Sequence, residues 1–328
     1  IDSIGVCVLV LGACSASYED ASNAPAELTE VGFELAGDVT RTSISEDGMT
    51  TRWSVGDRLY VWAKGADESF TFENTSFMLR YYSEEFDKAY FTSNIPSMGQ
   101  GEYTYYLTYP QPKSVEGTVA TYSLPAQQSG KYEGGNDIMV AEPVVAEALT
   151  SAKKVELNTI MRHQMHALKI TIPEKASNFD NRVYSLEITF PTGVVGDISL
   201  DVTNPEGEPT YSNLSNTITV RSNEGFEVGS DIWVFVLPGI VSGDVSYKIV
   251  GLEQRSEVAT YHLEREFQRG HVTPIRMAMP PFEKYTAFNF SIGENHLGED
   301  FNFFTLYDHN GTNMGTYNRN AENRYTWE

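Results

Sequence analysis

Cysteine is scarce in this chain of 328 residues, which holds two, Cys7 and Cys14. A framework of disulfides, on which small secreted domains depend, is therefore excluded, and the body must be held by a core of its own. Basic residues are also scarce, since 23 Lys and Arg stand against 45 Asp and Glu, for a formal net charge of −22. Such a surface repels phosphate backbones, so we expect no nucleic acid partner.

The sequence also lacks long apolar runs and familiar catalytic motifs. After Cys14 no run approaches the roughly 20 residues of a membrane-spanning helix. Gly-x-Ser-x-Gly, His-Glu-x-x-His, phosphate-loop and Cys-x-x-Cys motifs are missing. His163 and His166 would point to opposite faces of a strand, and residues 308–313 depart from calcium-loop spacing. We therefore predict no enzyme activity, no cofactor and no metal site.

An apolar run at residues 8–14 ends in Leu-Gly-Ala-Cys, and small, polar and acidic residues follow. This pattern is typical of a bacterial lipoprotein signal, in which the thiol of Cys14 takes a lipid. No Met or basic residue precedes Ile1, so we expect the sequence to start inside the signal peptide. We predict a partial signal peptide at 1–13, a flexible tether at 14–26, and attachment to the outer membrane through the lipid. The alternative is a short buried strand that ends in Cys14.

Period-two alternation of apolar residues recurs through the rest of the chain. With 26 Gly, 19 Tyr and 17 Phe, this favours an all-β protein with short strands and tight turns. The segment 232–237 is apolar on both faces, which predicts a central strand. The inward positions that we expect to be buried are Val31, Phe33, Leu35, Leu59, Val61, Leu168, Ile170, Val234 and Val236.

Two breaks divide the chain into domains. The polar stretch near 150–162 separates a predicted β-sandwich at 27–160 from a second at 161–282. Paired prolines after Met279 end the second domain, because proline terminates a strand and stiffens a linker. Residues 283–328 form a β-rich extension, which either begins a third module or adds strands to the second domain.

Several motifs together resemble the fimbrillin family. Thr-Arg-Thr-Ser at 40–43 is followed by an Asp-Gly turn at 47–48 and by Arg-Trp-Ser-Val-Gly-Asp and an apolar strand at 52–61. The segment 162–170 is similar to the family strand that opens the second domain, although its spacing is looser. The segment 267–275 resembles the final hairpin. With the lipoprotein signal, the resemblance covers roughly residues 9–282.

The resemblance implies two transthyretin-like β-sandwich domains in tandem, plus the short C-terminal extension. It implies a pilus subunit (stalk, tip or accessory) of the fimbrium at the cell surface, exported as a lipoprotein. In this family an arginine-specific protease removes the first strand, and a strand of another subunit takes its place. Arg41 and Arg52 are the candidate cleavage sites here, Arg41 first, because cleavage there frees the whole first strand. The alternative is that Arg41 is a solvated charge at the start of the second strand.

Two other functions compete with this interpretation. One is a carbohydrate-binding surface lipoprotein that does not polymerise and binds a host or bacterial glycan or protein ligand. Its candidate stacking residues are Trp62, Trp327 and the aromatic run at 103–106. The other is a glycosidase, because a pair of the many carboxylates could meet at the required spacing.

Overall fold

The structure is a computed structural model that describes residues 28–36, 43–44, 51–54, 56–83, 88–173, 182–251, 254–284, 303–307, 313–319 and 325–327. Strands account for nearly all regular structure in these ranges, and the helical structure there is one 3-10 turn, η1 (Gly134–Asn136). The predicted all-β class is confirmed. In the described ranges no helix is long and apolar enough to cross a membrane.

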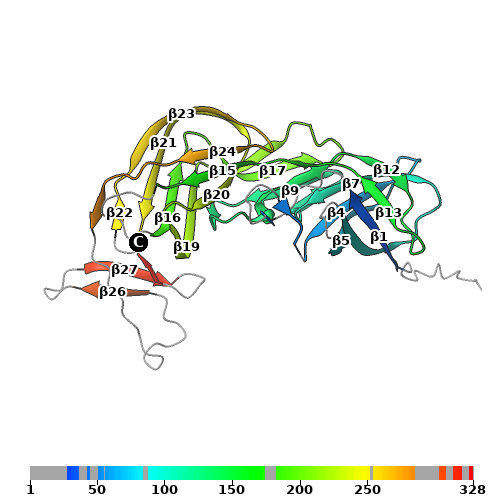
Figure 1. Cartoon of the computed structure of the whole chain (residues 1–328), viewed down its shortest axis with the longest axis horizontal. Helices are drawn as coiled ribbons and strands as arrows, with labels where there is room; N and C mark the ends of the chain where they lie inside the picture. The colour runs from blue at the N-terminus through cyan, green and yellow to red at the C-terminus, as the bar shows by residue number, and fades with distance from the viewer. Residues whose placement is uncertain are drawn as a thin grey trace, which may run out of the picture. The chain divides into compact units, whose positions relative to one another are not determined.

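The largest sheet of the described residues has nine strands, and β1 lies near one edge of it (Figure 1). The strand β12 (Val144–Glu147) pairs with β7 beside the main path of the sheet. The main path runs in the order β13 (Val155–Asn158), β1 (Leu28–Ala36), β6 (Lys88–Pro96), β5 (Phe70–Tyr82), β4 (Arg58–Lys64), β7 (Glu102–Tyr109), β11 (Met139–Ala141) and β14 (Met161–His163).

The other sheets are built largely from the second half of the chain. A seven-stranded sheet contains β10 (Gln127–Gln128), β19 (Thr217–Glu227), β16 (Arg182–Thr189), β21 (Gly239–Val250), β22 (Gln254–Ser256), β25 (Phe282–Lys284) and β23 (Ala259–Phe267). A four-stranded sheet contains β18 (Thr210–Ser215), β17 (Val195–Asp201), β9 (Val119–Leu124) and β8 (Ser114–Glu116). A three-stranded sheet contains β20 (Asp231–Val236), β15 (His166–Thr171) and β24 (Val272–Arg276).

Smaller elements complete the described chain. The strands β2 (Ser43–Ile44) and β3 (Thr51–Arg52) form a hairpin. The chain divides into two compact units, residues 1–283 and residues 284–328. In the second unit β26 (Phe303–Tyr307), β27 (Asn313–Arg319) and β28 (Tyr325–Trp327) form an antiparallel sheet.

Two hydrophobic cores lie within the first unit, and the nine-stranded sheet contributes to both. Leu59 and Val61 of β4 belong to the first core, which draws on residues 31–161. Tyr60 and Trp62, on the opposite face of the same strand, belong to the second core, which draws on residues 60–277. Because side chains alternate along a strand, one strand supplies both cores. All nine positions that the sequence predicts as buried are buried.

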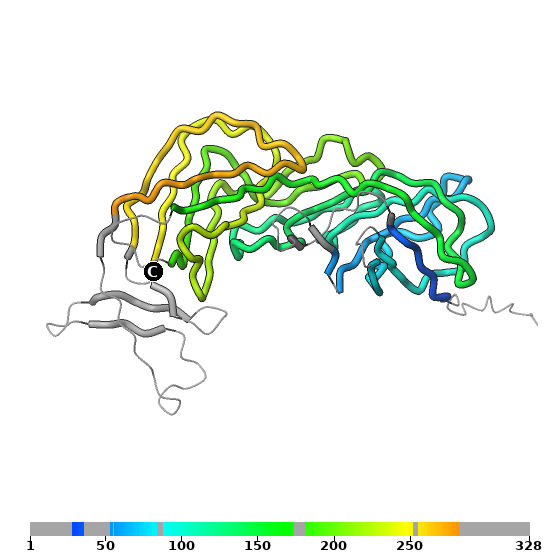
Figure 2. The backbone as a smooth tube through the Cα atoms, viewed as in Figure 1, coloured from blue at the N-terminus to red at the C-terminus, as the bar shows by residue number. Residues whose placement is uncertain are grey.

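Strand pairing connects the two halves of the chain. The strand β9 pairs antiparallel with β17, and β10 pairs parallel with β19. Figure 2 shows the backbone of both halves as a tube coloured by residue number. Residues before 130 therefore complete sheets of the second half, and the division at residues 160 and 161 stays a prediction.

One prediction about strand position is wrong. The strand β20 lies at the edge of its three-stranded sheet and pairs there with β15 alone, rather than in the centre. Its side chains are apolar on both faces because both faces pack in the second core, and other segments cover its free edge. The amide nitrogen of Trp233 donates to Gly130 O at 2.7 Å, and that of Leu237 donates to Val194 O at 2.7 Å. Loops therefore satisfy this edge where a neighbouring strand was expected.

Candidate functional site

The candidate site is the strand β1 together with the groove that holds it. On one side β1 pairs antiparallel with β6 along its whole length, from Leu28 opposite Pro96 to Ala36 opposite Lys88. On the other side it pairs parallel with β13, from Phe33 opposite Val155 onward. The first strand that the structure describes is thus inserted between two strands that lie far from it in the sequence, β6 and β13.

The inward face of β1 fills the first core. Val31 is 4% exposed, and Phe33 and Leu35 are 0% exposed. The ring of Phe33 packs 5.1 Å from that of Phe77 and 5.8 Å from that of Phe91, centroid to centroid. Burying each of these side chains fully is worth roughly 1.5–3 kcal/mol, so they help to hold β1 in place.

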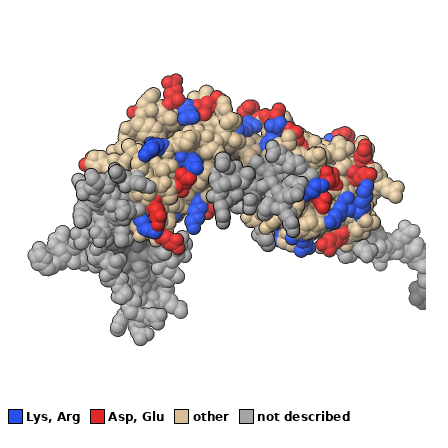
Figure 3. All heavy atoms as spheres, in the orientation of Figure 1, with Lys and Arg blue, Asp and Glu red and all other residues tan. Residues whose placement is uncertain are grey.

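The outward face of β1 carries Glu30, Gly32 and Glu34, and basic side chains from other strands and a loop meet both acids. Arg80 Nη2 lies 3.4 Å from Glu30 Oε1. Lys88 Nζ and Lys154 Nζ each lie 3.9 Å from a carboxylate oxygen of Glu34. Acidic and basic side chains are interspersed over the face of the molecule drawn in Figure 3.

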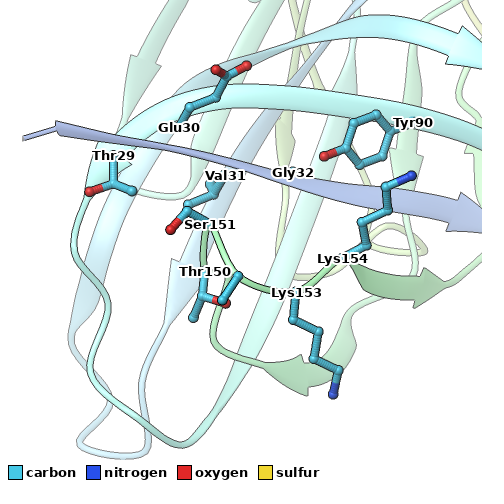
Figure 4. A pocket seen from close by; sticks show the side chains of 10 residues that line it. Thr29, Glu30, Val31, Gly32, Tyr90, Thr150, Ser151, Lys153 and Lys154 are labelled. Carbon is cyan, nitrogen blue, oxygen red and sulfur yellow. The ribbon is translucent and has the colours of Figure 1, made fainter.

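Tyr90 covers Gly32 on this outward face (Figure 4). The Tyr90 ring stacks on that of Tyr81, with centroids 4.9 Å apart, and Lys154 Nζ lies 4.6 Å from the Tyr90 centroid. Lys154 also donates a hydrogen bond to the Tyr81 hydroxyl, and this bond is the main reason why the pKa of Lys154 is raised. The two tyrosines and the lysine form a layer over the middle of β1.

A pocket of about 490 Å³ lies beside the first half of β1, where the pairing with β13 has not yet begun (Figure 4). The loop that leads into β13 forms its opposite wall. The lining is polar and lacks catalytic or metal-binding groupings. It consists of Thr29, Glu30, Val31, Gly32, Tyr90, Thr150, Ser151, Ala152, Lys153 and Lys154.

The Trp-x-x-Gly-Asp motif closes one edge of the first core. Trp53 is 5% exposed, and its ring meets those of Phe91 and Tyr109 edge-on at 5.3 and 5.7 Å. Gly56 turns the chain with φ +99°, and the amide nitrogen of Ser54 donates to Asp57 Oδ2 at 2.6 Å. The motif thus supplies a turn and a tryptophan that caps the core.

The predicted processing sites fall largely beyond the described residues. Cys14 and Arg41 lie outside them, and so does the calcium-like segment 308–313 except for Asn313. Arg52 is the last residue of β3 and stands opposite Ser43 of β2. The structure therefore brings Arg52 into a short hairpin and leaves lipidation and cleavage as predictions.

The aromatic residues considered for sugar stacking are mostly occupied within the protein. Trp62 and Tyr105 are 0% exposed and Tyr106 is 8% exposed. Tyr103 is half-buried, and its hydroxyl donates to Gly99 O at 3.1 Å. The side chain of Trp327 lies outside the described residues. Trp62, Tyr105 and Tyr106 thus serve the cores and offer no platform to a sugar ring.

The two histidines of His-x-x-His lie in different environments. His163 Nδ1 lies 2.7 Å from Asp137 Oδ1. His166 is buried and lies between Gln268 O and Thr273 Oγ1, at 2.8 and 2.9 Å. Burial lowers the pKa of His166. Over the described ranges no three His, Cys, Asp or Glu residues are placed to hold a metal ion.

The layer of side chains over Gly32 was not predicted from the sequence. The alternation Glu-Val-Gly-Phe-Glu at 30–34 shows that a glycine faces outward between two acids, which was the available signal. Tyr90 and Lys154 could not be assigned to it, because they come from segments far from β1 in the sequence.

Comparison with known proteins shows likeness in structure alone. No protein-family model matches the sequence, and no curated protein matches it. The chain is similar to the crystal structure of a candidate cell adhesion protein from Bacteroides uniformis, with a TM-score of 0.51 and 17% identity over 78% of this chain and 95% of that one. It is also similar to one from Bacteroides ovatus, with a TM-score of 0.52 and 15% identity over 80% of this chain and 100% of that one. The chain thus shares its fold with these proteins.

Proposed function

We propose that this protein is a structural subunit of a cell-surface pilus. It is exported as a lipoprotein through Cys14 and assembles by strand addition. Proteolysis frees β1, and an extended strand of another subunit takes its place between β6 and β13. The single observation that carries the proposal is the position of β1, the first strand of the described residues, which fills the first core and has a strand neighbour on each side.

Loss of β1 would create a strong acceptor for another strand. The pockets of Val31, Phe33 and Leu35 would be exposed, and the facing edges of β6 and β13 would lose their backbone partners. An open edge of this kind pairs readily with an extended chain, in which backbone bonds supply affinity and alternate side chains fill the pockets. A subunit that has lost β1 would therefore bind a strand from its neighbour.

The polar connection from β1 to β4 supplies the place for cleavage. Arg41 falls between β1 and β2, so cleavage after it would separate the whole of β1 from the rest. Arg52 ends β3 within the β2–β3 hairpin, where strand pairing holds the backbone. Cleavage after Arg52 would have to open this pairing, whereas cleavage after Arg41 frees the whole of β1, so Arg41 is the preferred site.

Treatment of the purified protein with an arginine-specific protease tests this function. We expect a shortened chain, followed by ladders that resist mild detergent. The double variant Arg41→Ala with Arg52→Ala should stay intact and monomeric. Arg276→Ala, an exposed arginine at the end of β24, is the matched control and should behave as the wild type. Ladders from the double variant, or trimmed wild type without ladders, would reject strand exchange and leave a non-polymerising surface adhesin.

A further inference from the structure

The outward face of β1 fits its surroundings as closely as the inward face does. Every outward position from Glu30 to Glu34 meets a side chain that reaches it from another strand or loop. An incoming strand that took the place of β1 would meet the same groups, because none of them belongs to β1. The groups are Arg80 of β5, Lys88 and Tyr90 of β6, and Lys154 in the loop just before β13.

The position of Gly32 tolerates no side chain as the groove stands. A Cβ built on Gly32 would lie 2.3 Å from the Tyr90 hydroxyl oxygen, 2.6 Å from Tyr90 Cζ and 2.9 Å from the carbonyl oxygen of Phe91. Real Cβ atoms are essentially never found within 3.0 Å of another heavy atom. The Tyr90 ring is restrained by Tyr81 and Lys154, and the Phe91 oxygen belongs to the backbone of β6. Both obstacles would persist after β1 left.

The two positions that flank this glycine face fixed positive charge. Arg80 Nε donates to Thr92 Oγ1 at 2.7 Å, and Lys88 Nζ lies 2.8 Å from Glu156 Oε2. These partners lie on β6 and β13, so the two cations keep their places without β1. Loss of Glu30 and Glu34 would leave a basic rim on a chain of net charge −22. Such a rim attracts acidic residues and repels basic ones.

We infer that this groove selects its incoming strand by an outward pattern of acid, glycine and acid at alternate positions, with large apolar residues between them. The inference rests on the proposed function, since it applies to a groove from which β1 has been removed. The partner is an extended segment that carries Glu or Asp, apolar, Gly, apolar, Glu or Asp. Residues 30–34 of a second copy of this chain have this pattern, and so would any subunit segment built in the same way.

The glycine contributes more to the selection than the acids. Arg80 and Glu30 are 48% and 62% exposed, and Lys154 and Glu34 are 54% and 27% exposed. Water and salt weaken ion pairs with this exposure. A side chain at the glycine position must instead displace backbone or a restrained ring, which is costly in a closely packed site. A strand with the acids but without the glycine should therefore bind poorly.

Peptide exchange on the full chain tests the inference. A site for a specific protease is inserted within residues 37–42, the chain is cleaved there, and a fluorescent peptide with the sequence of Leu28–Ala36 is added in excess. Binding is followed by fluorescence anisotropy, and replacement of β1 is verified by native mass spectrometry. The Gly32→Ala peptide should bind about tenfold or more weakly. The peptide with Glu30→Lys and Glu34→Lys should bind about three- to tenfold more weakly, and the loss should shrink at high salt. A Leu28→Ala peptide is the matched control, because Leu28 is 59% exposed.

Complementary protein variants identify the groups responsible. Tyr90→Ala should narrow the gap between the Gly32→Ala and wild-type peptides, and Lys88→Glu with Lys154→Glu should reverse the preference between the acidic and basic peptides. Equal binding of all the peptides would overturn the inference and leave the proposed function intact. Failure of the wild-type peptide itself to replace β1 would overturn the proposed function and the inference with it.

Discussion

The side-chain amide of Gln128 is bonded to both backbone groups of Phe235, since its Nε2 donates to Phe235 O and its Oε1 accepts from Phe235 N, each at 2.8 Å. Gln128 is 4% exposed and Phe235 is 2% exposed. One side chain from the first half of the chain thus takes the place of a strand partner at the free edge of β20.

Gln128→Ala should destabilise the protein by about 2–4 kcal/mol, because each buried backbone group left without a partner costs about 1–3 kcal/mol. The free energy of unfolding in urea measures the effect. The neighbouring Gln127 is exposed, and Gln127→Ala is the matched control, expected to change stability by less than about 0.5 kcal/mol. Equal stability of the two variants would show that the edge of β20 does not depend on Gln128.

Phe33→Ala should destabilise the protein by about 3–5 kcal/mol, because it leaves a cavity between Phe77 and Phe91. Leu28→Ala lies on the same strand but is 59% exposed, so it should change the free energy of unfolding by less than about 0.5 kcal/mol. Thermal and urea unfolding of both variants would check this. A small effect of Phe33→Ala would mean that β1 is held mainly by its backbone bonds.

Protonation of Asp197 should lower the free energy of unfolding in acid. Hydrogen bonds from Lys113, Asn213 and Ser123 lower the pKa of Asp197 from 3.8 to about 2. Because the folded-state pKa is the lower one, the stabilisation is present above pH 3.8 and is lost as the pH falls towards 2. The size of the loss is about 2 kcal/mol, from about 1.4 kcal/mol for each pKa unit.

Unfolding in urea at a series of pH values between 5 and 2 would measure this loss. The difference in stability between wild type and Asp197→Asn should shrink across that range. Asp244→Asn is the control, since the side chain of Asp244 is 73% exposed. A constant difference between wild type and Asp197→Asn would refute the assignment.

Local alternation was sufficient to predict a subset of the strands and the inward faces of those strands. Val31, Phe33, Leu59 and Val61 are buried as expected, because a period of two fixes which side chains share a face. Local alternation does not predict which strands are neighbours in a sheet. The pairing of β9 with β17 and the edge position of β20 depend on contacts between distant segments, and no local pattern encodes them.

The same limit applies to the candidate site. The first strand and its inward residues could be predicted from residues 31–35 alone. The meeting of Gly32 with Tyr90 could not, because it depends on the register of β1 against β6, in which Gly32 stands opposite Thr92 and Tyr90 opposite Glu34. A covering ring of this kind becomes visible only when the strands are paired.

A reversible lock on β1 tests the central claim most directly. Glu30 and Asn94 are exposed and stand opposite each other on β1 and β6, so Glu30→Cys with Asn94→Cys places two thiols within reach of a disulfide. The background carries Cys7→Ser and Cys14→Ser, and Glu30→Cys alone is the control. After cleavage between β1 and β2, the oxidised protein should stay monomeric, and dithiothreitol should release detergent-resistant ladders. Ladders of equal yield from the oxidised, locked protein would contradict assembly through the β1 groove.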